Sequence, residues 1–190
     1  MTSLVPFAID FSSVLTIAAD VFILFLFVLL LTPLQDRGWG KKAASWLGRF
    51  AIPFSFAIGA ASVIGSLFFS EVAGFAPCEL CWIQRGLLYT LAVILAVGLI
   101  ARKSERRRAF DNFMRKAGLV ISAIGFPIAA YNVYLQFGGN SLIPCSATGP
   151  SCSFVYFVRF GYVTIPTMSL TAFALIIALM LLGEGAQEVR

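Results

Sequence analysis

The chain contains no histidine among its 190 residues, and charged residues make up only 12% of it. Without histidine, a zinc site with imidazole ligands and a Ser-His-Asp catalytic triad are both excluded. A haem attached through a C-x-x-C-H motif is also excluded, because Trp82 follows the pair formed by Cys78 and Cys81. Any redox or nucleophilic chemistry therefore points first to the cysteines, of which there are 4.

The scarcity of charge is matched by a hydrophobic share of 59%, above the roughly 45–50% of soluble domains. Apolar stretches recur that are long enough to cross about 30 Å of hydrocarbon with roughly 20 residues each. We expect five membrane spans, at residues 12–34, 51–73, 82–100, 119–136 and 164–183. Residues 1–10 carry no lysine or arginine, unlike the start of a signal peptide, so the first span is expected to be retained.

The basic residues gather between the expected spans and predict an orientation. The first and third connections hold most of them: Arg37, Lys41, Lys42 and Arg49, then Arg102, Lys103, Arg106, Arg107, Arg108, Arg115 and Lys116. Connections rich in lysine and arginine stay in the cytoplasm, which explains the net charge of +5 better than a nucleic-acid partner does. The N-terminus, the turn at 71–81 and the loop at 137–163 are then expected outside, and the C-terminus inside.

A C-x-x-C pair, Cys78 and Cys81, opens the third span directly after Pro77. If the helix begins there, Cys78, Cys81 and Arg85 lie on one helix face. The helix N-terminus and a nearby guanidinium both favour thiolates. Arg85 is unusual inside an apolar span, where ionisable residues are costly and often functional. The alternative is an arginine that extends to the outer headgroups.

The second pair, Cys145 and Cys152, encloses six residues that include Gly149 and Pro150, which favour a turn. Both pairs are expected on the outer side, where disulfides form and persist. The second pair is open to two interpretations, a static disulfide that staples the loop or a labile and reactive one. A zinc site with four thiolates is disfavoured by the spacing, and no metal is expected.

Two other features admit alternatives. The loop at 137–163 is rich in aromatic residues: Phe154, Tyr156, Phe157, Phe160 and Tyr162. It is expected either to lie in the headgroup region or to pack on the helix bundle. Asp20, within the first span, is expected to be protonated, paired with another helix, or close to the outer surface.

Three segments resemble the disulfide-bond formation protein B family (DsbB): Pro77-Cys-Glu-Leu-Cys-Trp-Ile-Gln-Arg85, the short second cysteine pair, and Ile165-Pro-Thr-Met-Ser-Leu-Thr-Ala-Phe173. The close spacing of the second pair is nearer to the BdbC branch of that family. The resemblance implies an all-α integral membrane protein, with a four-helix transmembrane bundle and one extra N-terminal transmembrane helix. The expected regions are 1–49 for that helix and a cytoplasmic loop, 50–183 for the core with its two cysteine loops, and 184–190 for a cytoplasmic tail.

The same resemblance implies a thiol:quinone oxidoreductase in a bacterial cell membrane. It would reoxidise a secreted thioredoxin-like (DsbA-like) disulfide oxidase and pass two electrons to ubiquinone or menaquinone. Asn132, Tyr134 and Gln136 would then contact a quinone carbonyl, or simply form hydrogen bonds between helices. The alternative function is a structural membrane protein with static extracytoplasmic disulfides.

Individual roles also follow from the resemblance. Cys145–Cys152 is the disulfide that the partner attacks, and Cys145 forms the mixed disulfide. Cys152 then exchanges with Cys78 through a transient bond, which passes the electrons to the Cys78–Cys81 pair. Cys81 faces the quinone as a thiolate in a charge-transfer contact, and Arg85 helps to bind the quinone.

Overall fold

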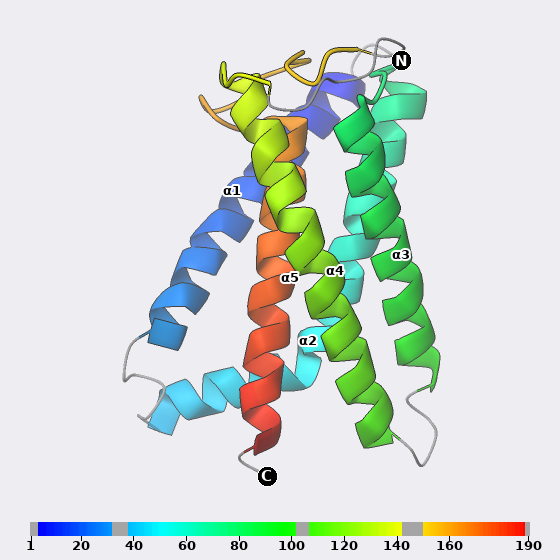
Figure 1. Cartoon of the computed structure of the whole chain (residues 1–190). Coiled ribbons are helices and arrows are strands. Elements are labelled where there is room, and N and C mark those ends of the chain that lie inside the picture. Colours follow the sequence, from blue (N-terminus) through cyan, green and yellow to red (C-terminus); the bar gives the residue numbers. More distant parts are fainter. Residues whose placement is uncertain (1–3, 32–37, 102–106, 142–149, 189–190) are drawn as a thin grey trace.

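The computed structural model describes residues 4–31, 38–101, 107–141 and 150–188, and this part of the chain is dominated by long helices (Figure 1). Their bounds are Leu4–Leu31 for α1, Gly38–Leu67 for α2, Glu79–Ala101 for α3, Arg107–Gln136 for α4 and Ile165–Glu188 for α5. A short π-helix, η2, continues α2 over Phe68–Val72. In hydrocarbon, a helix satisfies every backbone polar group within its own segment, which is why apolar runs of this length fold in this way.

Within the described residues, five helices are long and apolar enough to span a membrane: Leu4–Val28, Trp46–Val72, Glu79–Ile100, Phe110–Gln136 and Ile165–Gly183. The second, third and fifth agree closely with the prediction. The first begins at residue 4 rather than 12, and the fourth at 110 rather than 119. Both helices continue through charged residues that have partners: Asp10 pairs with Arg159, and Arg115 donates to the Gly48 carbonyl.

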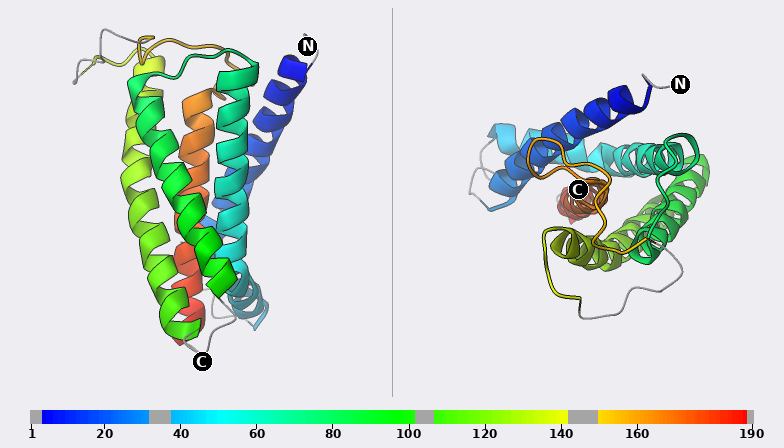
Figure 2. Two further views of the ribbon diagram at one scale, coloured as in Figure 1. Left: turned by 90° about the vertical axis from the view of Figure 1, so that its right-hand side faces the viewer. Right: turned by 90° about the horizontal axis from the view of Figure 1, so that it is seen from above.

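The helix α5 lies at the centre of the bundle, with the other helices around it (Figure 2). It packs against α1, α2 and α4, while α3 packs against α2 and α4. Accordingly, 56% of the most apolar part of α5 is buried, against 17% for α1, which lies at the periphery. The connections between α2 and α3 and between α4 and α5 lie at the same end as the N-terminus, and the C-terminus lies at the other end.

Close packing around α5 depends on a small residue opposite a large one. The ring of Phe173 is fully buried and clusters with Leu88 and Ala129. It lies over Gly125 of α4, where an added Cβ would come within 2.4 Å of the ring. Glycine at this position lets α4 and α5 approach closely, as small residues commonly do between membrane helices.

Hydrogen bonds of Asp20 join α1 to α5 and to the loop that connects α4 with α5. Its carboxylate accepts hydrogen bonds from Thr171 Oγ1 at 2.6 Å and from Tyr162 Oη at 2.8 Å. Partial burial and the Asp20 carboxylate raise the pKa of Tyr162 to about 12. Of the alternatives for Asp20, pairing with another helix is confirmed.

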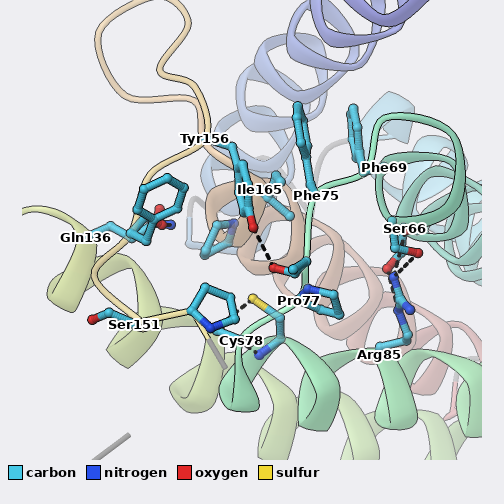
Figure 3. A pocket seen from close by; sticks show the side chains of 16 residues that line it. Ser66, Phe69, Phe75, Pro77, Cys78, Arg85, Gln136, Ser151, Tyr156 and Ile165 are labelled. Carbon is cyan, nitrogen blue, oxygen red and sulfur yellow. Dashed lines mark hydrogen bonds between the residues drawn. The ribbon is translucent and has the colours of Figure 1, made fainter. Parts of the chain in front are cut away.

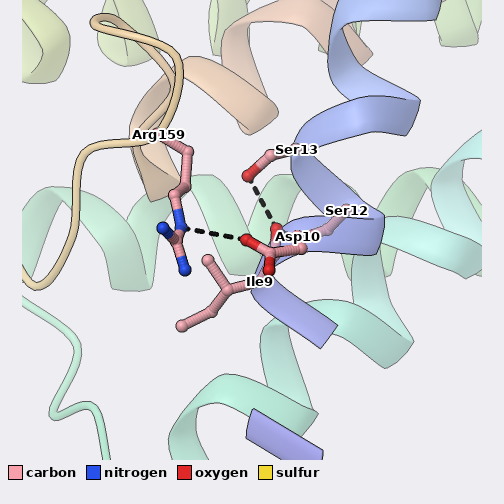
Figure 4. Close-up of polar contacts among 5 residues, drawn as sticks. All are labelled: Ile9, Asp10, Ser12, Ser13 and Arg159. Carbon is pink, nitrogen blue, oxygen red and sulfur yellow. Dashed lines mark hydrogen bonds and ion pairs between the residues drawn. The ribbon is translucent and has the colours of Figure 1, made fainter. Parts of the chain in front are cut away.

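A second contact joins α1 to the same loop. Asp10 Oδ1 lies 3.0 Å from Arg159 Nε, and both side chains are partly exposed (Figure 4). Arg159 and Val163 exchange two backbone hydrogen bonds across a tight turn. Phe160 and Gly161 complete that turn with positive φ angles of 52° and 81°. One face of α1 is therefore attached to the segment that leads into α5.

Some aromatic residues of this loop pack on the helix bundle, which is one of the two expected arrangements. Tyr156 stacks on Phe75 with ring centroids 4.5 Å apart, and Phe157 lies 6.2 Å from the same ring. These two side chains pack on the end of the bundle. Phe154 and Phe160 remain exposed.

Candidate functional site

Cys78 is the residue that begins α3. The helix starts at Glu79, and the Cys78 carbonyl accepts the first helical hydrogen bond, from Trp82 N at 3.0 Å. The Cys78 sulfur accepts a bond from the Cys81 amide at 3.4 Å, as the side chain of an N-cap residue does. Cys78 thus lies one residue before the helix rather than within it, and its sulfur still turns toward Cys81.

The two sulfurs of the C-x-x-C pair are in contact. Cys78 Sγ and Cys81 Sγ lie 2.8 Å apart, and both residues are free thiols. The hydrogen bond from the Cys81 thiol is the main reason that the pKa of Cys78 falls from 9.0 to about 6, with burial opposing it and Asn132 adding to it. A thiolate at neutral pH is the nucleophilic form of cysteine.

Asn132 reaches the pair from α4. Its side chain is fully buried, and its Nδ2 lies 3.5 Å from Cys81 Sγ and 3.9 Å from Cys78 Sγ. Asn132 was expected either to contact a quinone carbonyl or to form a hydrogen bond between helices. The structure has the second, from Asn132 of α4 to the Cys81 sulfur of α3. Gln136, one turn further along, donates instead to the Phe154 carbonyl at 3.0 Å and so holds the loop that follows Cys152.

Cys152 packs directly on this centre. It is disulfide-bonded, 2% exposed, and clusters with Cys78 and Leu135. Cys81 borders the same cluster. Cys145, its predicted disulfide partner, lies outside the described residues. The fold thus brings three of the four predicted cysteines together although two helices separate them in sequence.

Arg85 is buried and faces the protein interior rather than the headgroups. Its Nε donates to Ser66 Oγ at 2.9 Å, and its Nη2 donates to the Ser66 carbonyl at 2.8 Å and to Ser70 Oγ at 2.9 Å. The guanidinium also lies 5.0 Å from the ring of Trp82. Both serines lie where α2 changes to a π-helix, a distortion that is frequent at functional sites.

A cavity of about 50 Å³ opens between the cysteines and Arg85 (Figure 3). Its walls are mainly apolar and aromatic, with Phe69, Phe75 and Tyr156 among them. A second cavity of about 30 Å³ shares Cys81 and Arg85 and reaches Gln84. The Nε2 of Gln84 is buried and has no hydrogen-bond partner in the described part of the chain. The site therefore combines a dithiol, a cation and a free donor on an apolar surface.

Comparison with known proteins supports the resemblance. The family model described as "Disulfide bond formation protein DsbB" matches residues 48–183, which include both cysteine regions and Arg85. The chain belongs to the DsbB family. No solved structure matches it. The DsbB match begins within α2, so α1 lies outside it.

Curated relatives in the DsbB comparison are also named for disulfide formation. "Disulfide bond formation protein C" of Bacillus subtilis (strain 168) is 37% identical over 136 residues, which cover 70% of this chain and 92% of the relative. "Probable disulfide formation protein C 2" of Bacillus cereus is 33% identical over 76% of this chain and 98% of its own length. This DsbB-family chain is therefore a multi-pass bacterial membrane protein with an oxidoreductase role in disulfide bond formation.

Some polar residues of this DsbB-family site were not among the sequence predictions. Ser66, Ser70 and Gln84 contact Arg85 or line the cavities. A signal for them was present, because polar side chains inside apolar spans are uncommon and usually face other helices. Their proximity to Arg85 depends on the packing of α2 against α3, which the sequence does not show.

Proposed function

We propose that this protein is a thiol:quinone oxidoreductase that reoxidises an extracytoplasmic thioredoxin-like oxidase and passes two electrons to membrane quinone. The observation that carries the proposal is the placement of a disulfide-bonded Cys152 against two free thiols that share a cavity with Arg85. Such an arrangement lets electrons move from a surface loop to a membrane pocket by thiol exchange alone.

The cavity has the chemical character that a quinone requires. An apolar, aromatic wall suits the ring, and Arg85 and the unpaired Gln84 Nε2 supply donors for its carbonyl oxygens. The volume of about 50 Å³ is smaller than the roughly 150 Å³ cavity that accepts benzene in another protein. Binding therefore requires the ring to stay partly in the lipid, or side chains such as Phe75 and Tyr156 to move.

The proposed path has two exchanges that balance in electrons. A reduced partner attacks the Cys145–Cys152 bond at Cys145 and leaves as a disulfide, so that both loop cysteines become thiols. The Cys152 thiolate then attacks Cys78 in the oxidised Cys78–Cys81 pair and releases the Cys81 thiolate. Cys145 attacks Cys152 in turn, which restores the loop disulfide and frees Cys78.

At this stage the inner pair carries both electrons, which corresponds to the bonding in the structure. A quinone bound in the cavity would accept two electrons and two protons, which leaves the Cys78–Cys81 disulfide. In the thiol state, Asn132 and the Cys81 amide donate to the Cys78 sulfur and favour its thiolate.

The test is turnover by the purified protein with a reduced thioredoxin-like partner and a soluble ubiquinone or menaquinone analogue, followed by quinone absorbance. We expect Cys81→Ser to abolish quinone reduction, while the partner still reduces the loop disulfide. No turnover with either quinone would count against the proposal. In intact cells, an oxidation state of the four cysteines that never changes with respiratory state would instead favour the structural alternative.

A further inference from the structure

Asn132 contacts both reacting sulfurs from a helix outside the C-x-x-C motif. Its amide nitrogen lies 3.5 Å from Cys81 Sγ and 3.9 Å from Cys78 Sγ. Within the described residues, the other polar contacts of these sulfurs come from the motif itself, namely the Cys81 amide and the contact between the thiols. One amide group has two N–H donors and can serve both sulfurs.

Burial of the Asn132 side chain costs free energy, because its amide oxygen, Oδ1, has no hydrogen-bond partner among the described residues. An unsatisfied buried acceptor is unfavourable, and an apolar side chain of similar size would avoid it. The benefit of an asparagine at this position therefore lies in its donor.

A donor at this place discriminates between the redox forms of the pair. Thiolate sulfur carries a full charge and is a good acceptor, whereas disulfide sulfur is neutral. In a buried site the difference is enlarged, because little water competes for the charge. A neutral amide also adds no charge of its own to the membrane interior.

We propose that Asn132 raises the reduction potential of the Cys78–Cys81 pair by donating to its reduced form, so that the pair accepts electrons from Cys152 more readily. This role deepens the proposed function and rests on it for its biological meaning. The reaction that it biases takes up two electrons as the Cys78–Cys81 bond breaks, and one proton when Cys78 remains a thiolate. Ionisable groups near the pair include Glu79 and Arg85 of α3, Tyr131 of α4, and Cys152 and Tyr156 of the loop.

The experiment measures the equilibrium of the inner pair with glutathione, in protein whose Cys145 and Cys152 are replaced by alanine. Two glutathione thiols supply the electrons and become glutathione disulfide. We expect Asn132→Leu to shift the equilibrium constant between the inner pair and glutathione about tenfold toward the protein disulfide. This shift equals a decrease in reduction potential of about 30 mV for a two-electron couple. Asn132→Asp, with the same shape but an acceptor in place of the donor, is expected to shift it further in the same direction.

Ser122→Ala is the matched control, because Ser122 is also fully buried on α4 and its hydroxyl has no partner among the described residues. An unchanged constant in this control, with the thiolate absorbance of the two Asn132 variants appearing at higher pH, supports the proposal. Unchanged constants in both Asn132 variants would overturn it, as would an equal shift in Ser122→Ala. The measurement uses neither quinone nor partner, so a failure of quinone turnover would leave its result intact.

Discussion

At the scale of single residues, Cys78 combines a structural and a chemical role. Its backbone begins α3, and its sulfur accepts the amide of Cys81 as an N-cap does. The Cys81 amide, which caps the helix, thus also helps to stabilise the thiolate, beside the larger contribution of the Cys81 thiol. This explains in physical terms why a C-x-x-C pair at a helix N-terminus is reactive.

The first prediction concerns the pH dependence of Cys78. Because its pKa is lowered to about 6, the thiolate fraction rises with pH and is half complete near that value. Alkylation of reduced protein by iodoacetamide, followed for the Cys78 peptide by mass spectrometry, should show this midpoint. Cys81→Ala removes the largest cause and should move the midpoint toward 9.0. Midpoints near 9.0 in both proteins would contradict the assignment.

The second prediction concerns the stabilising contacts of Arg85. Arg85→Met removes the charged donor of three hydrogen bonds, to Ser66 Oγ, the Ser66 carbonyl and Ser70 Oγ, and should lower the free energy of unfolding by about 3 kcal/mol. Arg85→Lys should recover little of this, because an ammonium lacks the planar fork. Denaturation in detergent measures both.

The control is Arg159→Met. This arginine pairs with Asp10 at a partly exposed position and should contribute at most about 1 kcal/mol. Equal losses at the two positions would show that Arg85 has no special structural role.

At the scale of helices, α1 is the element that the family match leaves out. It packs on α5, and its Asp20 forms hydrogen bonds to Thr171 and Tyr162. Helix association in lipid relies on such bonds and on close packing, since the hydrophobic effect does not drive it there. Asp20 is therefore expected to be a main determinant of where α1 docks.

The third prediction is a coupling between α1 and α5. A double-mutant cycle with Asp20→Ala and Thr171→Val should give an interaction energy of about 1 kcal/mol in thermal or denaturant unfolding. In the part of the chain that the structure describes, the Ser13 hydroxyl bonds within α1, to the Ile9 carbonyl at 2.6 Å, so a cycle of Ser13→Ala with Thr171→Val should give no interaction energy. Absence of coupling at Asp20 would mean that its bond to Thr171 does not help to hold α1 on α5.

At the scale of the whole molecule, the two ends of the bundle differ in composition. The cysteine centre and the N-terminus lie at one end, and the C-terminus lies at the other (Figure 1). The first turns of α2 and α4 lie near the C-terminal end, and the first halves of these helices carry the basic residues Lys42, Arg49 and Lys116. This separation fits the positive-inside expectation, which would place the cysteines where disulfides persist.

The fourth prediction tests this orientation. In protein without its native cysteines, Asn140→Cys near the cysteine end and Asn112→Cys near the other end are both at exposed positions. A membrane-impermeant maleimide applied to intact bacteria should label the first only. The second should react once the membrane is permeabilised. The opposite pattern would reverse the proposed topology and exclude an extracytoplasmic partner.

Much of the fold was predictable because it depends on local composition. Membrane spans follow from apolar length, and three of them agreed closely with expectation. The starts of the first and fourth did not, because a charged residue ends an apolar run in sequence but not in a fold that pairs it. Asp10 finds Arg159 from a loop that is far away in sequence, and no local pattern contains that information.

The sequence by itself determined the cysteine pairs, the unusual Arg85 and the family to which they belong, since these depend on residue identity and spacing. The tertiary structure alone decided which side chains surround the sulfurs. Asn132 from α4 and Cys152 from the loop meet the pair at α3, and Ser66 from α2 directs Arg85 inward. Such contacts arise from the packing of separate helices, whose relative rotation and depth are set by many small interactions at once.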